Sequence, residues 1–183
     1  YYRVYAVSPY GTCSADGTES WARTANHPLP FADDFEGSLQ GWTLTGAWSS
    51  ATGAVHSGSF ALTDSPGTNY MHSQDTWAQT AVDLTGAVWP VLTFWDRYAL
   101  AGGDWFRLEV SPDGSSWTPL YGVYHTASRP AWQRQQIDLS PWRGQANLRI
   151  RFRVSTDGDP ATTADGWFVD EVSVAEHVPG GYY

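Results

Sequence analysis

Strict alternation of apolar and polar residues is the feature that most constrains the fold of this chain. Residues 147–154 read Asn-Leu-Arg-Ile-Arg-Phe-Arg-Val, in which every second side chain is apolar and the three between them are arginine. Successive side chains of a β-strand point to opposite faces of its sheet. The pattern therefore predicts a strand with one buried and one solvated face. No stretch of ten or more residues shows convincing helical periodicity.

The same alternation recurs between turn sequences rich in Gly, Pro, Asp and Ser. Such turns are expected at 111–114, 140–144 and 156–160. Strands of about five to ten residues with turns between them indicate antiparallel sheets. The predicted fold is all-β, a two-sheet antiparallel β-sandwich of the jelly-roll type, which buries the apolar faces against each other. Further strands are expected at 104–111, Trp77–Asp83, Val91–Leu100, Trp117–His125, Trp132–Asp138 and Gly166–Ala175.

Charge and motif content exclude several classes of function. The net charge is −9, and nucleic-acid binding requires a basic stripe. Cys13 is the single cysteine, which excludes internal disulfides and a multi-cysteine zinc site. No apolar run is long enough to span a membrane. The motifs of serine hydrolases, zinc peptidases and nucleotide-binding enzymes are missing, so we expect no enzymatic activity.

Aromatic residues are too numerous to be only core, with 11 Trp, 10 Tyr and 7 Phe. Alternation places several Trp and Arg side chains outward, and we expect them to share one sheet. One interpretation is a binding face, in which Trp rings stack on sugars or side chains and Arg donates hydrogen bonds. The other is a stabilising ladder of cation–π and Arg–Glu contacts, through pairs such as Arg107 or Arg149 with Glu109. The candidate surface residues are Trp95, Trp105, Arg107, Trp132, Arg149 and Arg151.

The first residues form a separate unit of the sequence. Tyr1–Val7 alternates as an extra strand with apolar side chains on both faces, which makes it an open template for pairing. Two alternatives follow: addition of this strand to another copy, which builds a fibre, or packing of the tail on its own domain. The assembly residues are Tyr1, Tyr2, Val4, Tyr5 and Val7. The expected organisation is an extension at 1–24, a Pro-containing linker at 25–32, a sandwich at 33–176 and a tail at 177–183.

Two resemblances extend this interpretation. Residues 1–11 together with Ser20-Trp-Ala-Arg-Thr24 resemble the last two strands of a fibronectin type III domain. Residues 33–176 resemble the MAM-like and cleaved-adhesin-like jelly-roll accessory domains of secreted bacterial peptidases of the immune inhibitor A type. The motifs are Asp34-Phe-Glu-Gly37, His56-Ser-Gly-Ser-Phe-Ala-Leu62, Leu108-Glu-Val-Ser-Pro-Asp-Gly-Ser-Ser-Trp117 and Asp165-Gly-Trp-Phe-Val-Asp-Glu-Val172.

The second resemblance implies an extracellular, non-catalytic binding or adhesion module of a larger secreted or surface protein. The alternative is a structural subunit of an extracellular fibre or surface layer. The partners implied are other copies of the chain, other surface proteins and polysaccharide.

The same resemblance implies a structural calcium ion (Ca²⁺) between the first and last strands of the sandwich. Calcium takes six to eight oxygen ligands. An ion there would clip the two chain ends together. The alternative is that the acids are solvated or paired with Arg151. The implied ligands are Glu36, Asp170 and the main chain near Ser57 and Gly58, with Asp34 and Asp64 as additions.

Overall fold

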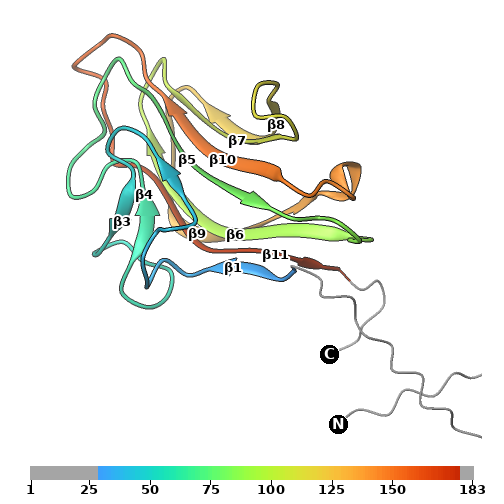
Figure 1. Ribbon diagram of the computed structural model, residues 1–183. Helices are drawn as coiled ribbons and strands as arrows, with labels where there is room; N and C mark the ends of the chain where they lie inside the picture. The colour runs from blue at the N-terminus through green and yellow to red at the C-terminus, as the bar shows by residue number, and fades with distance from the viewer. Residues whose placement is uncertain (1–28, 178–183) are drawn as a thin grey trace, which may run out of the picture.

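The computed structural model describes residues 29–177, which fold into a sandwich of two antiparallel β-sheets (Figure 1). This confirms the predicted fold class. The expected extension at 1–24, the first half of the linker at 25–32, Cys13 and nearly all of the tail at 177–183 lie outside the described residues. Between residues 29 and 177, no helix is long and apolar enough to cross a membrane.

Most neighbouring strands in the two sheets are far apart in the sequence. Sheet A has the order β3-β4-β11-β6-β9, and β1 also pairs with β11. Its strands are β1 (Phe31–Asp33), β3 (Ser49–Ala51), β4 (Ala61–Thr63), β6 (Pro90–Leu100), β9 (Ala127–Asp138) and β11 (Gly166–Glu176). Sheet B has the order β2-β5-β10-β7-β8. Its strands are β2 (Thr43–Leu44), β5 (Asp75–Val82), β7 (Trp105–Ser111), β8 (Thr118–Tyr124) and β10 (Leu148–Ser155).

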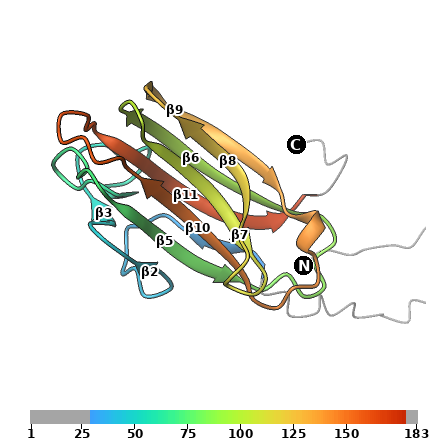
Figure 2. The same cartoon turned by 90° about the horizontal axis from the view of Figure 1, so that it is seen from above.

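The strands of both sheets run in nearly the same diagonal direction in Figure 2, as in an aligned sandwich. A single 3-10 turn, η1 (Ser140–Trp142), follows β9 within the described part of the chain.

The core lies between the inner faces of the two sheets. The apolar side chains of β10 are buried there, as their alternation predicts. Trp167 of β11 lies at the centre, fully buried, and its ring is stacked on Phe106 with centroids 4.2 Å apart. Phe152 meets the same indole edge to face, with centroids 5.2 Å apart. These aromatic contacts across the sandwich fix the distance between the sheets.

The strand boundaries differ from the sequence prediction in two respects. The short strands β1 to β4 were not predicted, because two or three residues show too little alternation to reveal a strand. One of them, β1, begins at Phe31 and so occupies part of the expected linker 25–32. The edge strand β9 begins at Ala127, five residues before the predicted Trp132. Pro130 lies in this added part, where an edge strand tolerates proline.

A β-bulge interrupts β11 on its way along β6. The register shifts between Asp170 and Ser173, and Glu171 has a left-handed backbone with φ 50°. Val169 and Val172 both remain buried in the core although they are three residues apart. The bulge therefore turns both Asp170 and Glu171 toward the outer face of sheet A.

Candidate ligand-binding groove on sheet A

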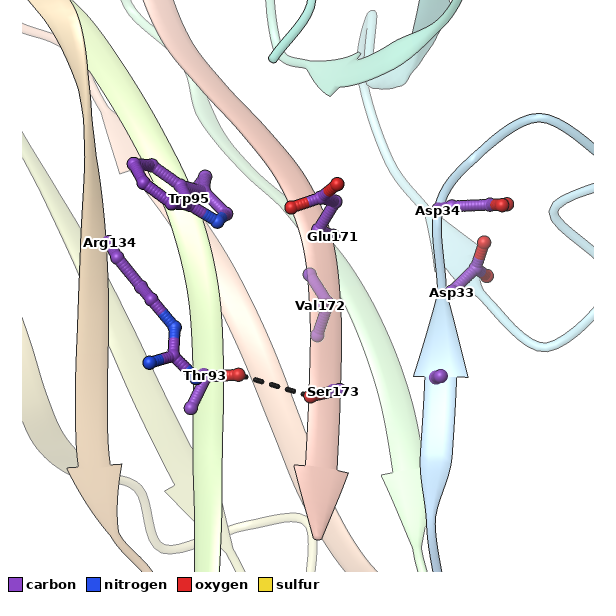
Figure 3. A pocket seen from close by; sticks show the side chains of 9 residues that line it. Asp33, Asp34, Thr93, Trp95, Arg134, Glu171, Val172 and Ser173 are labelled. Carbon is purple, nitrogen blue, oxygen red and sulfur yellow. Dashed lines mark hydrogen bonds between the residues drawn. The ribbon is translucent and has the colours of Figure 1, made fainter. Parts of the chain in front are cut away.

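The outer face of sheet A carries a hollow of about 270 Å³, here called the groove. Figure 3 shows that its side chains come from four neighbouring strands, β9, β6, β11 and β1. Strand alternation brings Thr93, Trp95 and Ser173 to this face, since the residues next to them in their strands, Leu92, Phe94, Val172 and Val174, are buried in the core. The lining residues are Ala32, Asp33, Asp34, Thr93, Trp95, Arg134, Glu171, Val172 and Ser173.

An aromatic cluster forms one end of the groove. The imidazole of His56 stacks on the indole of Trp95, with centroids 3.9 Å apart and an interplanar angle of 15°. Trp132 of β9 meets the same imidazole edge on, with centroids 5.9 Å apart. His56 comes from the loop before β4, so the cluster joins three separate parts of the chain. The contacts hold the Trp95 ring in one orientation beside the groove.

Glu171 projects into the groove from the bulge of β11 (Figure 3). One of its oxygens accepts a hydrogen bond from the Ser57 hydroxyl at 2.7 Å, and the other lies 3.1 Å from Nδ1 of His56. A left-handed backbone is unfavourable for a residue with a side chain, and such positions concentrate at functional sites. The bulge, the hydroxyl and the imidazole together aim this carboxylate beside the Trp95 ring.

The floor and far wall of the groove are polar. Thr93 and Ser173 hydrogen-bond to each other at 3.0 Å across β6 and β11, as drawn in Figure 3. The side chain of Arg134 lies on β9, directly opposite Trp95 in register. Asp33 is held by the Trp42 indole N–H at 2.7 Å, and Asp34 by a backbone amide. Among the described residues that line the groove, three are carboxylates and one is a guanidinium, so the site is acidic.

The donors and acceptors of this groove suit a ligand rich in hydroxyl groups. Carboxylates accept hydrogen bonds from hydroxyls, and a guanidinium donates to them. A flat indole beside these groups offers an apolar surface for the C–H face of a sugar ring. The groove thus combines a few polar groups with one aromatic wall, the usual composition of a binding site for a small ligand.

The predicted surface residues do not share one sheet, which corrects that expectation. Trp95 and Trp132 lie on sheet A, and both belong to the aromatic cluster. The other four belong to sheet B and therefore face away from the groove. Alternation shows which side chains of one strand point outward, but it does not show to which sheet the strand belongs. The four residues on sheet B are Trp105, Arg107, Arg149 and Arg151.

The outer face of sheet B carries the predicted ladder of arginine, aromatic and acidic side chains. Glu109 lies at its centre, with 3% of its side chain exposed, and its carboxylate is 2.6 Å from Arg151 and 3.6 Å from Arg153. Arg107 reaches the same carboxylate at 3.9 Å. The Arg151 guanidinium also stacks on the Trp117 ring at 3.7 Å. These are the cation–π and Arg–Glu contacts of the ladder interpretation, and their role in stability stays a prediction.

Two arginines of sheet B, Arg149 and Arg153, make contacts that the ladder predicted from the sequence did not include. The guanidinium of Arg149 lies against Gly114 in the turn after β7, instead of pairing with Glu109. Arg153, which was not singled out, forms a two-pronged ion pair with Asp75, with both N–O distances 2.6 Å. This pair lowers the pKa of the Asp75 carboxyl, mainly through the hydrogen bonds from Arg153.

The residues implied as calcium ligands fall into two groups. Glu36 and Asp170 both contact the turn at 56–60. Through these contacts the turn joins the first and last strands of the sandwich, as expected. Glu36 accepts hydrogen bonds from the amides of Ser59 and Phe60 at 2.7 and 2.8 Å. Asp170 accepts from the amides of the two residues that open the turn, at 2.8 and 3.2 Å. Burial raises the pKa of Asp170, and these amide donors oppose that shift.

Asp64 lies outside this arrangement. Its carboxylate accepts the backbone N–H of Trp167 at 2.8 Å. Trp167 is three residues from Asp170 along β11, which is about 10 Å at the rise of a strand. Burial raises the pKa of Asp64 to about 7, and the Trp167 amide opposes this shift.

The alternative pairing of the implied calcium ligands with Arg151 is wrong, because Arg151 pairs with Glu109 on the other sheet.

The donor set at the turn does not fit a calcium ion as arranged. Calcium needs carboxylates completed by carbonyl oxygens. Here the turn directs amide N–H groups at the carboxylates of Glu36 and Asp170. Between residues 29 and 177, no three His, Cys, Asp or Glu side chains are placed so that they could hold a metal ion. We call the contacts of these two acids with residues 56–60 the amide clip; the ion itself stays a prediction.

No protein-family model matches the sequence, and no curated protein is significantly similar to it. Solved structures share its fold. A cleaved adhesin domain of Lys-gingipain from Porphyromonas gingivalis is 17% identical, and the match covers 81% of this chain and 99% of that domain with a TM-score of 0.55. TmCBM61, solved with beta-1,4-galactotriose, is 18% identical over 77% of this chain and 92% of its own, with a TM-score of 0.53.

A third structure, the CBM22-1 xylan-binding domain from Paenibacillus barcinonensis Xyn10C, is 16% identical. The match covers 81% of this chain and 95% of that domain, with a TM-score of 0.52. At these identities the comparisons show the fold alone. They confirm the jelly-roll fold that the cleaved-adhesin-like resemblance implies, whereas the MAM-like, immune inhibitor A and fibronectin type III parts of the resemblance stay predictions. The chain therefore has the jelly-roll fold of cleaved adhesin domains and carbohydrate-binding modules.

Proposed function

We propose that the protein is a non-catalytic, extracellular binding module that recognises polysaccharide through the groove on sheet A. The observation that carries this proposal is the fixed Trp95 ring beside the Glu171 carboxylate on an open sheet face. A ring held in place loses little entropy when a sugar stacks on it. A carboxylate aimed by a bulge is ready to accept the hydroxyl hydrogens of that sugar.

Two further observations support a saccharide as the ligand. One of the solved structures with this fold is a complex with beta-1,4-galactotriose, and another is a xylan-binding domain. The groove crosses several strands, its carboxylates accept hydrogen bonds from side chains or a backbone amide, and Thr93 and Ser173 hydrogen-bond to each other. Such a site binds by shape and hydrogen bonding and needs no bond-making group. An adhesion role through a glycan ligand fits the same site.

The fibre alternative depends on Tyr1–Val7, which lies outside the described residues. It stays a prediction, to be tested by light scattering of the chain with and without residues 1–24. A monomer in both cases would exclude strand addition between copies.

Binding to a panel of polysaccharides tests the proposed function. We expect retardation in affinity electrophoresis on gels that contain xylan, galactan, mannan or glucan, and we expect Trp95→Ala to abolish it. Trp117→Ala removes an indole of the same size from the opposite sheet and is the matched control. Equal loss in both variants would indicate a folding defect, which circular dichroism would show. Absence of retardation on every gel would overturn the proposal.

A further inference from the structure

We infer that the groove continues along β6 and β9 into a second hollow at Trp89, and that the two together bind the interior of a linear, neutral polysaccharide. This inference rests on the proposed function and names the ligand class more closely. The second hollow has a volume of about 330 Å³. Its lining residues are Trp89, Val91, Gln136, Asp138, Ser140 and His177.

Strand register places the two hollows end to end. In the β6–β9 ladder, Trp95 pairs with Arg134, Thr93 with Gln136, and Val91 with Asp138. Their side chains share the outer face, because the alternate residues Leu92 and Phe94 are fully buried in the core. Thr93 lines the groove and its partner Gln136 lines the second hollow. The two hollows therefore meet at this pair.

The distance between the end aromatics exceeds one sugar unit. Trp95 and Trp89 are six residues apart, which spans about 20 Å at the rise of a β-strand. A monosaccharide cannot touch both rings. An extended chain that lies along β6 and β9 can do so, with polar side chains of β9 beside it between the two rings.

Trp89 has an exposed indole on a backbone that is fixed by hydrogen bonds. The residue is 50% exposed, among the highest values for a large apolar residue in the described chain. The amides of Val88 and Trp89 donate to the Glu176 carboxylate at 2.9 and 2.8 Å. The carbonyl of Trp89 accepts a hydrogen bond from the backbone N–H of His177 at 2.8 Å. A large apolar ring on a pinned backbone is a typical contact residue.

The charges along this path select a neutral chain. Asp33, Asp34 and Glu171 line the groove, and Asp138 lines the second hollow. Arg134 is the one guanidinium among the described lining residues of either hollow. A uronate-rich or sulfated chain would meet a surplus of like charge, in a protein whose net charge is −9. Hydroxyl groups of a neutral chain instead find carboxylate acceptors in both hollows.

Calorimetric titration with neutral oligosaccharides of increasing length tests this inference. The probes are xylo-, galacto-, manno- and gluco-oligosaccharides from the disaccharide to the hexasaccharide, with polygalacturonate as the acidic probe. We expect affinity to rise with length. Trp89→Ala should lower the affinity for the hexasaccharide about tenfold and leave that for the disaccharide unchanged, whereas Trp95→Ala should abolish binding of both. Met71→Ala, another exposed apolar side chain, is the control.

The outcomes separate the two proposals. If Trp89→Ala matches the wild type at every length while Trp95→Ala abolishes binding, the extended path is overturned and the glycan-binding groove stands. Tighter binding of polygalacturonate than of every neutral probe would overturn the neutral class. If no saccharide binds at all, both the inference and the proposed function are overturned.

Discussion

The imidazole of His56 lies flat against the indole of Trp95, although the two residues come from different elements of sheet A and its loops. The backbone amide of His56 donates to Asp170, and its ring contacts Glu171. The imidazole thus links the bulge of β11 to the Trp95 ring. It makes the orientation of the indole depend on the loop before β4.

His56→Ala is expected to weaken glycan binding about two- to tenfold, since a stacked aromatic pair contributes about 0.5–1.5 kcal/mol. The Trp95 ring would then sample several rotamers in the free protein. Calorimetry measures the affinity. His72→Ala is the matched control, because His72 is half-buried like His56, its imidazole hydrogen-bonds to the neighbouring Ser73, and it does not belong to the lining of the groove. Equal affinity of the two variants would show that the stack does not orient the binding site.

Glu109→Gln is expected to destabilise the fold by about 3 kcal/mol, the cost of breaking a buried ion pair from one side. Glu109 is almost fully buried, and three guanidinium groups lie around its carboxylate. Asp75→Asn removes another carboxylate of the same ladder, and the side chain of Asp75 is 49% exposed. It should cost about 1 kcal/mol or less because solvent screens that pair. Urea unfolding measures both, and equal losses would contradict a central role of Glu109.

Asp64 should make the fold less stable as the pH rises from about 4 to 7. Burial raises its folded-state pKa to about 7, whereas an unfolded aspartate releases its proton near pH 4. In this range the folded state holds a proton that the unfolded state has lost, so stability falls by up to about 1.4 kcal/mol per pH unit and is level above pH 7.

Asp64→Asn keeps an oxygen for the Trp167 amide and removes the titration. The slope of unfolding free energy between pH 5 and pH 7 should therefore be shallower than in the wild type. Part of the slope should persist, because burial also raises the pKa of Asp96 and Asp170. Identical slopes in urea titrations of variant and wild type would show that Asp64 ionises at an ordinary pH.

Calcium dependence distinguishes the amide clip from an ion site. The clip already joins Glu36 and Asp170 to one turn through backbone amides. It therefore predicts the same melting temperature in excess calcium and in excess chelator. A bound ion predicts a higher melting temperature in calcium, by mass action on the folded state. Such a rise would establish the calcium site and show that the turn rearranges around the ion.

Gly58→Ala probes the same clip from the turn side. Gly58 has a φ of +62°, and a Cβ placed there meets the Glu36 carboxylate. Gly67 also has a left-handed backbone, with φ +74°, but a Cβ there meets no atom within 4 Å. Both alanine variants suffer backbone strain of about 1 kcal/mol. Gly58→Ala should lower the free energy of unfolding more than Gly67→Ala does, because it also breaks the amide clip. Equal free energies of unfolding for the two variants would show that the clip contributes no stability.

The sequence was sufficient to predict the long strands and to predict which of their side chains point away from the core. Leu148 to Val154 alternate without interruption, and the structure buries every apolar member. The sequence was insufficient to predict the order of the strands in the sheets, because that order depends on contacts between segments far apart in the chain. For this reason Trp95 and Trp105 were expected on one face and lie on opposite faces.

Glu171 was missed although the sequence carried a signal for it. Val169-Asp-Glu-Val172 sets two apolar residues three positions apart, which a regular strand cannot bury on one face. That spacing indicates a bulge, and a bulge presents two adjacent acids outward. Asp33 and Arg134 gave no comparable signal, because only the pairing of β1 with β11 and of β9 with β6 brings them to the groove.

The pairing of β1 with β11 also determines how the domain responds to mechanical force. Phe31 pairs with Val174 and Asp33 with Val172, so the two ends of the domain leave from the same end of one antiparallel ladder (Figure 1). Tension between residues 29 and 177 would load this ladder one pair at a time and peel β1 away, instead of shearing all of its hydrogen bonds together. Peeling requires far less force than shearing, so β1 would be the first strand to yield under load.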